Sequence, residues 1–420
     1  MTQPMDQPAR ASAFRGSPSV ARRTPEVGPV ELFFDLVYVF AIIQLSHLLI
    51  DRLTWEGMAQ TAVLFAAVWW GWNYTAWAMN WLDPGRIPVQ LLTGVLMLAA
   101  LGMAIAIPGA FGAGAGMFVA CALFMGVLRP LFMIVAFRGS VLSGNYRLLL
   151  IWTLAAGAFW IAGCFVEPAW RLPIWLVAVL LDYAAPLFQF RVPLLGSAPM
   201  ETWDTDPEHL AERNRLVFII ALGESVLLMG GAAVYAGGLD ARLGLDLVLG
   251  FATLFLLWWN YFAVARHDVR GEDESTAALR TAYAYAHAAM VFGAILIAVS
   301  IELRLSHDHL TPAIVLVSVA GPAVYLVGNL LFLRSRPGGF GRLARSRVAA
   351  VAALAGIGAV GVPLADVLPP AALGLGVLAV MLVLAVLTGR PSPAPSDPDA
   401  LSDPDSDAAP GVGTGTASAR

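Results

Sequence analysis

Apolar residues occur in long runs along most of the chain, and short polar or turn-forming segments separate these runs. A helix that crosses the hydrocarbon layer of a membrane needs about 20 consecutive, mostly apolar residues. The pattern therefore predicts an all-α integral membrane protein with about twelve transmembrane helices. We expect them at 30–50, 58–79, 87–107, 114–137, 147–166, 171–191, 210–232, 243–265, 279–301, 311–333, 346–366 and 371–388.

Polar segments divide this pattern into five parts. A polar linker at 196–209 separates a first six-helix half, 30–195, from a second half, 210–389. Segments 1–29 and 390–420 have little apolar surface to bury, so we expect both to be disordered. Because the first of them lacks the apolar core of a cleavable signal peptide, we expect the first helix itself to start insertion.

The two halves resemble each other in sequence. A shift of 180 residues aligns the sequence of residues 36–41 with that of 216–221, and the same shift aligns Gln44 with Glu224. One helix later, the sequence Trp-Asn-Tyr occurs in both halves. Since each half has an even number of helices, duplication predicts two repeats in parallel orientation, related by an axis along the membrane normal.

Composition agrees with a membrane protein and excludes several other classes. The chain is 59% hydrophobic and 13% charged, whereas soluble domains are roughly 45–50% apolar and 25% charged. The net charge of −4 does not indicate nucleic acid as a partner. Cys121 and Cys164 lie in apolar runs, so we expect neither disulfides nor a cysteine-bound metal. The stretch 112–116 lacks the Lys-Ser/Thr of a phosphate-binding loop, so we expect no nucleotide cofactor.

The arginines predict the orientation of the helices. Every basic residue is an arginine, and the absence of lysine beside abundant alanine and glycine is typical of a GC-rich bacterial genome. With the N-terminus inside, the outer loops hold only Arg52, Arg171, Arg242 and Arg304. Cytoplasmic loops carry an excess of Lys and Arg. This asymmetry predicts that both termini are cytoplasmic, and a miscount by one helix would destroy it.

Two segments carry a family resemblance. Residues 31–41, ELFFDLVYVFA, resemble the opening motif of the bacterial low temperature requirement protein A family. Residues 209–225, HLAERNRLVFIIALGES, resemble that family's second signature, and the resemblance extends over about 26–390. It implies a multipass protein of the bacterial cytoplasmic membrane that is linked by name to growth in the cold. It implies no particular substrate or catalytic mechanism.

Ionisable residues within a span are costly unless they are paired or face an internal cavity. The first helix carries Glu31 and Asp35 on one face, because residues four apart are neighbours on a helix. Gln44 and His47 lie deeper, on roughly the opposite face. We count all four as candidate substrate- or ion-binding residues.

The seventh helix carries Glu212, Arg213 and Arg215 near its start. The repeat shift places Asp35 over Arg215, so one hypothesis is a buried charge pair between Asp35 and Arg215 across the pseudo-symmetry axis. The alternative is that both residues lie among the lipid headgroups and mark the cytoplasmic interface. Glu212 and Arg215 are further candidate binding residues.

Glu224 is the strongest functional candidate. It follows Gly223 in an otherwise apolar stretch, and no residue three or four positions away on its own helix can pair with it. A group that changes charge inside a helix bundle is suited to carry a proton or to bind a cation. The alternative is a protonated carboxyl that hydrogen-bonds to a neighbouring helix. Gln44, at the equivalent place in the first half, is its neutral counterpart.

Weaker candidates lie elsewhere in the spans. Asp182 stands beside a predicted kink at Pro186, where backbone carbonyls become free. His287 is either a core histidine or a ligand, and two histidines, His47 and His287, do not predict a metal or haem site. The tryptophans of the second and eighth helices fit an interfacial belt and core packing.

Three classes of function remain open. The first is a secondary transporter or permease, coupled to protons or another cation, with Glu224 as the carrier and an unspecified small molecule as substrate. The second is an intramembrane or lipid-modifying enzyme that uses a carboxylate–histidine pair, either Glu224 with His287 or Asp35 with His47. The third is a membrane sensor or scaffold in the cold response. The lipid bilayer is the one partner common to all three.

Overall fold

The regular structure is helical throughout the described part of the chain. The computed structural model describes residues 20–22, 26–235, 238, 240–266, 276–335 and 341–389. Within them lie twelve long helices: α1 (Pro29–Asp51), α2 (Trp55–Ala78), α3 (Ile87–Ala106), α4 (Ala115–Ala136), α5 (Val141–Cys164), α6 (Pro168–Leu187), α7 (Pro207–Tyr235), α8 (Ala241–Arg266), α10 (His287–Ser306), α11 (Pro312–Arg334), α12 (Arg342–Gly361) and α13 (Pro370–Gly389).

The ninth helix has an irregular beginning. The short helix α9 (Thr276–Arg280) leads through a π-helical turn, η3 (Thr281–Ala286), directly into α10. Two 3₁₀ turns, η1 (Ile107–Gly109) and η2 (Met200–Trp203), complete the described elements. Single π turns inside helices are rare and are frequent at functional sites.

The predicted all-helical class and the twelve long helices are confirmed. Eleven of the helices are long and apolar enough to cross a membrane. Among the described helices of that length, α2 does not reach the required hydropathy, because it is rich in Trp and contains Asn73. Three predicted boundaries were wrong by five or six residues, one of them that of α12, which ends at Gly361 and not at 366. Helix α5 begins at Val141, where the Ser140 side chain caps it by accepting from Ser143 N, and α10 continues to Ser306, beyond its predicted end at 301.

Helix α10 lies at the centre of the bundle. In the apolar stretch of the span Thr281–Ser306, 83% of the residues are buried, whereas 28% are buried in that of α12. Helix α10 packs against α1, α2, α7, α8 and α11. Its approach to α11 is closest at Gly293, where an added Cβ would lie 2.5 Å from Tyr325 N. Small residues at such contacts let helix backbones approach closely.

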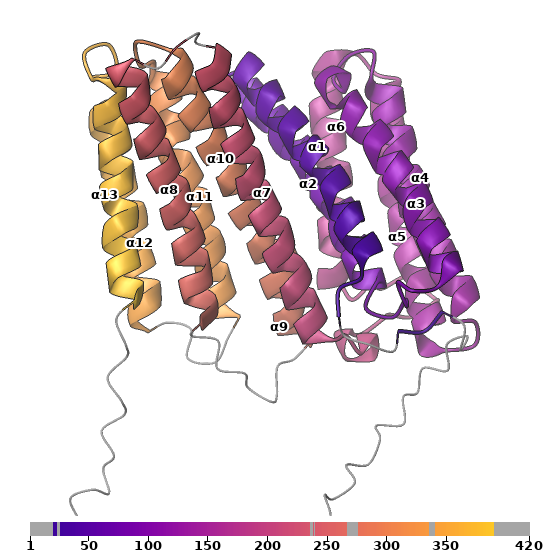
Figure 1. Cartoon of the computed structure of the whole chain (residues 1–420). Helices are drawn as coiled ribbons and strands as arrows, with labels where there is room; N and C mark the ends of the chain where they lie inside the picture. Colours follow the sequence, from indigo (N-terminus) through magenta and orange to yellow (C-terminus); the bar gives the residue numbers. More distant parts are fainter. Residues whose placement is uncertain are drawn as a thin grey trace, which may run out of the picture. The chain divides into compact units, whose positions relative to one another are not determined.

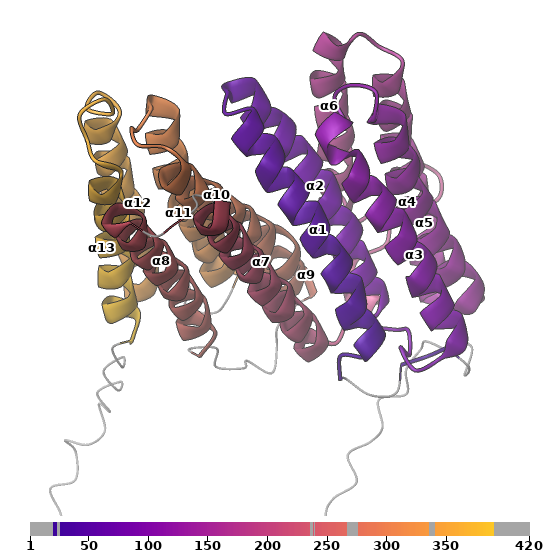
Figure 2. The same cartoon turned by 45° about the horizontal axis from the view of Figure 1, so that its top comes forward.

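Helices α1 and α7 lie side by side and run in the same direction (Figures 1 and 2). Residues at the start of α1 contact residues at the start of α7, and Ser46 of α1 faces Glu224 of α7 farther along. Helix α2 also joins the two halves. Its Trp69 Nε1 donates to Ala284 O at 2.8 Å, and Trp81, just beyond its end, donates to Asp204 O at 3.0 Å.

The chain before α1 returns to the end of α2. Residues 20–22 lie within the segment expected to be disordered, yet Ala21 forms an isolated bridge with Leu82, and Arg22 N donates to Trp81 O. The remaining expectation of disorder concerns 1–19, 23–25 and 390–420, which lie outside the described residues.

Candidate functional site

Local sequence fixes where α7 begins and therefore which side chains it presents to α1. The Asp206 carboxylate accepts from the backbone N–H groups of Glu208 and His209, at 2.9 and 3.3 Å. Such an N-cap satisfies donors that have no partner within the helix. Asp206 N in turn donates to Asn80 Oδ1 at 2.9 Å, which attaches this start to the end of α2.

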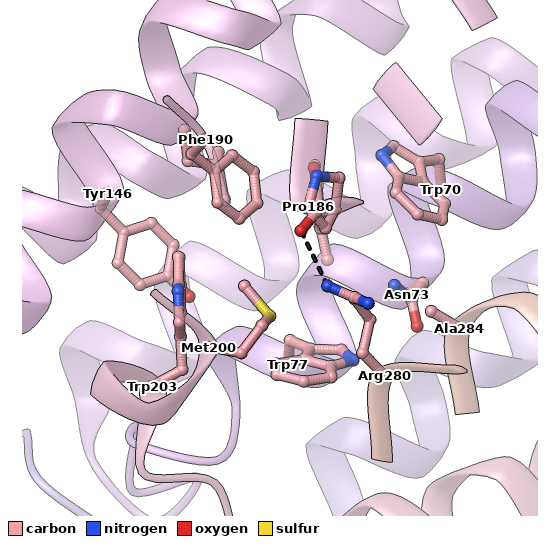
Figure 3. A pocket seen from close by; sticks show the side chains of 12 residues that line it. Trp70, Asn73, Trp77, Tyr146, Pro186, Phe190, Met200, Trp203, Arg280 and Ala284 are labelled. Carbon is pink, nitrogen blue, oxygen red and sulfur yellow. Dashed lines mark hydrogen bonds between the residues drawn. The ribbon is translucent and has the colours of Figure 1, made fainter. Parts of the chain in front are cut away.

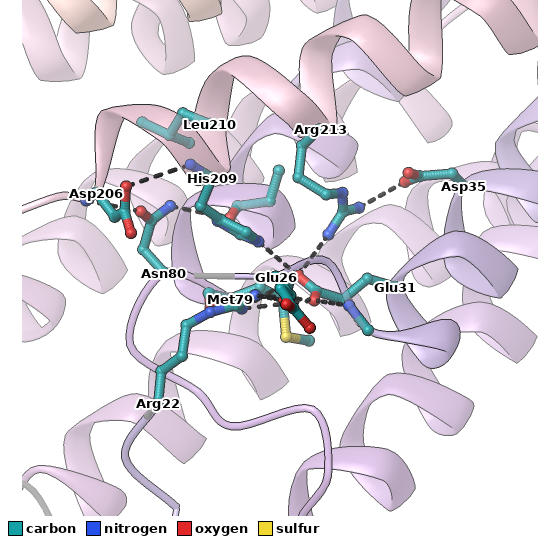
Figure 4. Close-up of polar contacts among 12 residues, drawn as sticks. Arg22, Glu26, Glu31, Asp35, Met79, Asn80, Asp206, His209, Leu210 and Arg213 are labelled. Carbon is teal, nitrogen blue, oxygen red and sulfur yellow. Dashed lines mark hydrogen bonds and ion pairs between the residues drawn. The ribbon is translucent and has the colours of Figure 1, made fainter. Parts of the chain in front are cut away.

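A buried cluster of charged side chains joins the starts of α1 and α7 (Figure 4). Glu31 Oε1 accepts from Arg213 Nη1 at 3.0 Å and lies 2.8 Å from His209 Nε2. Its other oxygen accepts from Gly28 N at 2.8 Å, and Arg22 approaches the carboxylate at 3.4 Å. Because Glu31 is an acceptor, His209 carries a proton on Nε2. We call Arg22, Glu31, Asp35, His209 and Arg213 the charge cluster.

Arg213 bridges the two acids of α1. Its Nη2 pairs with Asp35 Oδ1 at 2.5 Å, while its Nη1 reaches Glu31. Trp72 of α2 donates from Nε1 to the same Asp35 oxygen at 2.7 Å. The side chains of Glu31, Asp35 and Arg213 are all 0% exposed. Three helices therefore converge on one buried guanidinium and the two carboxylates that neutralise it.

The cluster holds α1 against α7 through charge. Its two carboxylates are matched by two guanidinium groups, Arg22 and Arg213. Removing one partner of a buried ion pair leaves an uncompensated charge, which typically costs about 3–5 kcal/mol. Separating the starts of α1 and α7 would expose the same groups, so the cluster resists opening at this end.

The predicted pair between Asp35 and Arg215 is wrong. Asp35 pairs with Arg213, and Arg215 lies 3.7 Å from Glu212 in a pair that is about 40–50% exposed. Residues two positions apart on a helix differ in direction by about 200° around its axis, so Arg213 and Arg215 point to nearly opposite sides. The repeat shift identified the correct two helices but not the side chain that faces α1.

Glu224 lies farther along the same helix pair, and its carboxyl group has no hydrogen-bond partner among the described residues. It is 1% exposed. Ser46 of α1 lies close to it, but neither Glu224 oxygen nor the Ser46 hydroxyl has a hydrogen-bond partner within the described part of the chain. Burying a carboxylate without a partner is strongly unfavourable. A carboxyl in this position is suited to take up a proton or to bind a cation.

A cavity of about 630 Å³ extends from Glu224 to the ends of α7 and α10. Tyr235 and Ser306, the last residues of these helices, lie along it with Arg242 at the start of α8. Glu224 is roughly 16 Å from Tyr235 along the axis of α7, at 1.5 Å per residue. The cavity therefore leads from the C-terminal ends of α7 and α10 well into the bundle.

Two further ionisable groups line this cavity. Glu302 of α10 is partly buried, and its Oε2 has no hydrogen-bond partner among the described residues. His47 of α1 is exposed. Gln44, three residues earlier, is partly buried and is not among the residues that line the cavity. The structure thus brings Glu224, His47 and Glu302 together and leaves Gln44 aside.

Asp182 lies in a separate place, in the first half of the chain. Trp160 Nε1 donates to its Oδ2 at 3.3 Å. Asp182 lines a small cavity of about 50 Å³ together with Arg129, which is 2% exposed. Arg129 Nη1 donates to Gly71 O and to Thr75 Oγ1. A space of this size holds about one or two water molecules.

An aromatic cavity of about 30 Å³ lies nearby, between α2, α5, α6 and the start of the ninth helix (Figure 3). Trp77, Tyr146 and Trp203 contribute rings to it. Arg280 reaches in from α9 and donates to Pro186 O at 2.8 Å. Pro186 O is one of the last carbonyls of α6, which have no partner within the helix, and it therefore binds a side chain of the second half.

His287 is a core histidine in this structure. Its Nε2 lies 2.9 Å from Tyr261 Oη and its Nδ1 lies 2.7 Å from Ala282 O. Neither of the two carboxylate–histidine pairs expected for an enzyme is present among the described contacts, since Glu224 has no partner there and Asp35 contacts Arg213 and Trp72. The described residues also contain no group of three or more His, Cys, Asp or Glu placed to hold a metal ion.

Three residues of these sites were not among the candidates from the sequence: His209, Arg213 and Glu302. A signal for the first two was present, because His209 and Arg213 are four residues apart, as are Glu31 and Asp35. Matching these two faces would have indicated the cluster. Glu302 lies just beyond the predicted end of its helix, so it was not considered.

Comparison with known proteins supplies a family but no chemistry. The family model described as "Bacterial low temperature requirement A protein (LtrA)" matches residues 26–386. The uncharacterized protein RA0937 of Rhizobium meliloti is 39% identical over 315 residues, which cover 72% of this chain and 76% of that protein. No solved structure matches the chain.

Proposed function

This chain is a multipass membrane protein of the bacterial low temperature requirement A family, and we propose that it is a secondary transporter coupled to protons or another cation. One observation carries the proposal: Glu224 is buried, has no partner among the described residues, and lies on a cavity that leads to the helix ends. A carboxyl in such a place gains a counter-charge only from a proton or a cation that enters through the cavity.

One end of the α1–α7 pair is closed and the other is open to a cavity, as expected for a transporter that opens to one side of the membrane at a time. The charge cluster binds the starts of the two helices together, whereas the cavity lies open between their later parts and α10. In the proposed cycle, a proton or cation reaches Glu224 through the cavity and neutralises it. The helix pair then closes at the cavity and opens at the cluster, which releases the bound species on the other side.

We also propose that the helices form two parallel six-helix repeats, 30–195 and 210–389. Their packing supports this. In each half the first helix contacts the second and third, the third contacts the fourth, and the fourth contacts the fifth. The fourth helix of each half also contains an internal proline, Pro130 in α4 and Pro322 in α11. The parallel direction of α1 and α7 is a further support.

The arginine distribution supports a location in the bacterial cytoplasmic membrane with both termini inside. In this orientation the charge cluster, at the starts of α1 and α7, faces the cytoplasm. The cavity around Glu224 then opens to the outside. In our proposal, the conformation of the structure is therefore closed toward the cytoplasm and open to the outside.

The proposal is tested with the full-length protein in liposomes that contain a pH-sensitive dye. A potassium diffusion potential drives protons inward, with or without sodium on the outside. We expect wild-type protein to give a flux above that of empty liposomes, and Glu224→Gln to reduce it at least tenfold. Glu208→Gln, which removes an exposed acid from the same helix, is the matched control and keeps the flux. A Glu224→Gln flux equal to that of wild type would overturn the assignment.

A further inference from the structure

The cavity that contains Glu224 has the size and the walls of a small-molecule site. Its volume of about 630 Å³ lies within the range of about 300–1,000 Å³ usual for such sites. Ile43, Leu227, Leu228 and Leu305 supply apolar wall. A site for a bare inorganic ion does not need a space of this volume or an apolar wall, so the cavity fits a larger occupant.

Besides His47, and Arg242 at the rim, the charged groups that line the cavity are acids. Glu224 contributes two carboxyl oxygens without a hydrogen-bond partner and Glu302 contributes one, within the described residues. The two acids come from different helices, α7 and α10, and act on each other electrostatically. Buried charges are normally paired or hydrogen-bonded. A cation placed between the two helices would satisfy both carboxylates.

The cation at the rim does not fill this role. Arg242 donates to His307 O at 3.2 Å and pairs with Asp308 at 3.1 Å, so its guanidinium is engaged by the loop after α10. No described residues form a group of three or more ligands for a metal ion. Two carboxylates beside apolar walls therefore match an organic cation better than a coordinated metal.

We infer that this cavity binds an amphipathic organic cation, such as a quaternary ammonium or phosphonium compound, with its charge at Glu224 and Glu302 and its apolar body against Leu227, Leu228 and Leu305. The inference rests on the proposed transport function and names the substrate class of the same site. Binding would place one positive charge where the structure holds unpartnered carboxylates, and would cover apolar wall that otherwise faces the cavity.

The test uses tetraphenylphosphonium and its anionic isostere tetraphenylborate as probes. Equilibrium dialysis with purified full-length protein in detergent measures the binding of each. Because the two ions have nearly the same shape and opposite charge, the comparison separates charge recognition from partition into an apolar groove. We expect saturable binding of the cation at one site and at least tenfold weaker binding of the anion.

Three variants refine the test. Glu224→Gln is expected to weaken cation binding at least tenfold and Glu302→Gln several-fold, while Glu208→Gln leaves it unchanged. Leu228→Trp, which fills the cavity without changing charge, should weaken it as well. Elution as a single symmetric peak in gel filtration shows that each variant is folded. Equal binding of cation and anion, or cation binding that survives both Gln substitutions together, would overturn the inference.

The outcomes also distinguish this inference from the proposed transport function. If Glu224-dependent proton flux is present and the organic cation does not bind, only the substrate class is wrong. If the organic cation binds through Glu224 but liposomes show no Glu224-dependent flux, the site is correct and transport is not. A bound phospholipid that the cation fails to displace, detected by native mass spectrometry, would count against an organic cation as the occupant.

Discussion

The two ends of the α1–α7 pair use the same kind of residue in opposite ways. At the helix starts, Glu31 and Asp35 are fully buried and are matched by Arg213 and other donors. Farther along, about 16 Å from Arg213 at 1.5 Å per residue, Glu224 is equally buried but has no partner within the described residues. Burial alone thus does not define a functional acid. A buried carboxylate with charged partners holds helices together, whereas one without such partners among the described residues is available to bind a proton or a cation.

The largest expected effect comes from breaking the paired end. Arg213→Met removes the guanidinium that both Glu31 and Asp35 contact, and leaves two buried acids with too few positive charges. We expect a loss of about 3–5 kcal/mol of unfolding free energy, measured by denaturation with SDS in mixed micelles. The triple variant Glu31→Gln, Asp35→Asn, Arg213→Met leaves no uncompensated charge and should recover part of the loss. A single Arg213→Met variant as stable as wild type would contradict the pairing.

The same substitution at both ends gives the sharpest form of the comparison. Glu31→Gln removes a carboxylate that accepts charged hydrogen bonds and should cost about 2–3 kcal/mol. Glu224→Gln removes a carboxylate that has no hydrogen-bond partner among the described residues, so it should leave the unfolding free energy unchanged or raise it, although we expect it to reduce the flux at least tenfold. Both variants are measured side by side by thermal unfolding in the same detergent. Equal destabilisation of the two would mean that Glu224 has a partner in the folded protein.

A smaller effect tests the part that α2 plays at the paired end. Trp72→Phe keeps an aromatic ring but removes the N–H that donates to Asp35. We expect a loss of about 1–2 kcal/mol, as for a buried acceptor that loses one donor. Trp77→Phe is the matched control, because Trp77 lies on the same helix and its Nε1 has no hydrogen-bond partner among the described residues. The thermal midpoints of the two variants should differ accordingly.

The smallest effect is expected at the pair that the sequence suggested. Arg215→Met breaks its contact with Glu212, in which both side chains are about 40–50% exposed. Partly exposed pairs of this kind contribute less than about 1 kcal/mol. A thermal midpoint close to that of wild type is therefore expected. A loss as large as that of Arg213→Met would return Arg215 to the cluster.

Sequence alone predicted the helices because each span depends on local hydrophobicity, which the residues of that span carry themselves. It also identified α1 and α7 as the helices that share a charge pair, through the repeat. It could not choose between Arg213 and Arg215, because the rotation of a helix about its own axis depends on its neighbours. The spacing of Glu31 with Asp35 was the local information that matched only Arg213 and His209.

The cavity could not be predicted from sequence for a different reason. Its acids come from α7 and α10, which are far apart along the chain, and only the packing of α10 at the centre of the bundle brings Glu302 near Glu224. The predicted pair of Glu224 with His287 is absent for the same reason. Glu224 and His287 were both recognised as buried ionisable residues, but His287 lies at the beginning of α10 and Glu302 near its end.

The tryptophans of α2 have a consequence for how the chain enters the membrane. Among the described helices long enough to span it, α2 alone falls short in hydropathy, and its rings find their partners on other helices, Trp69 at Ala284 and Trp72 at Asp35. The Ala284 partner is synthesised more than 200 residues later, so α2 emerges from the ribosome before that contact can exist. Insertion of α2 therefore depends at first on α1, and α2 reaches its final packed position only after the second half of the chain has been synthesised.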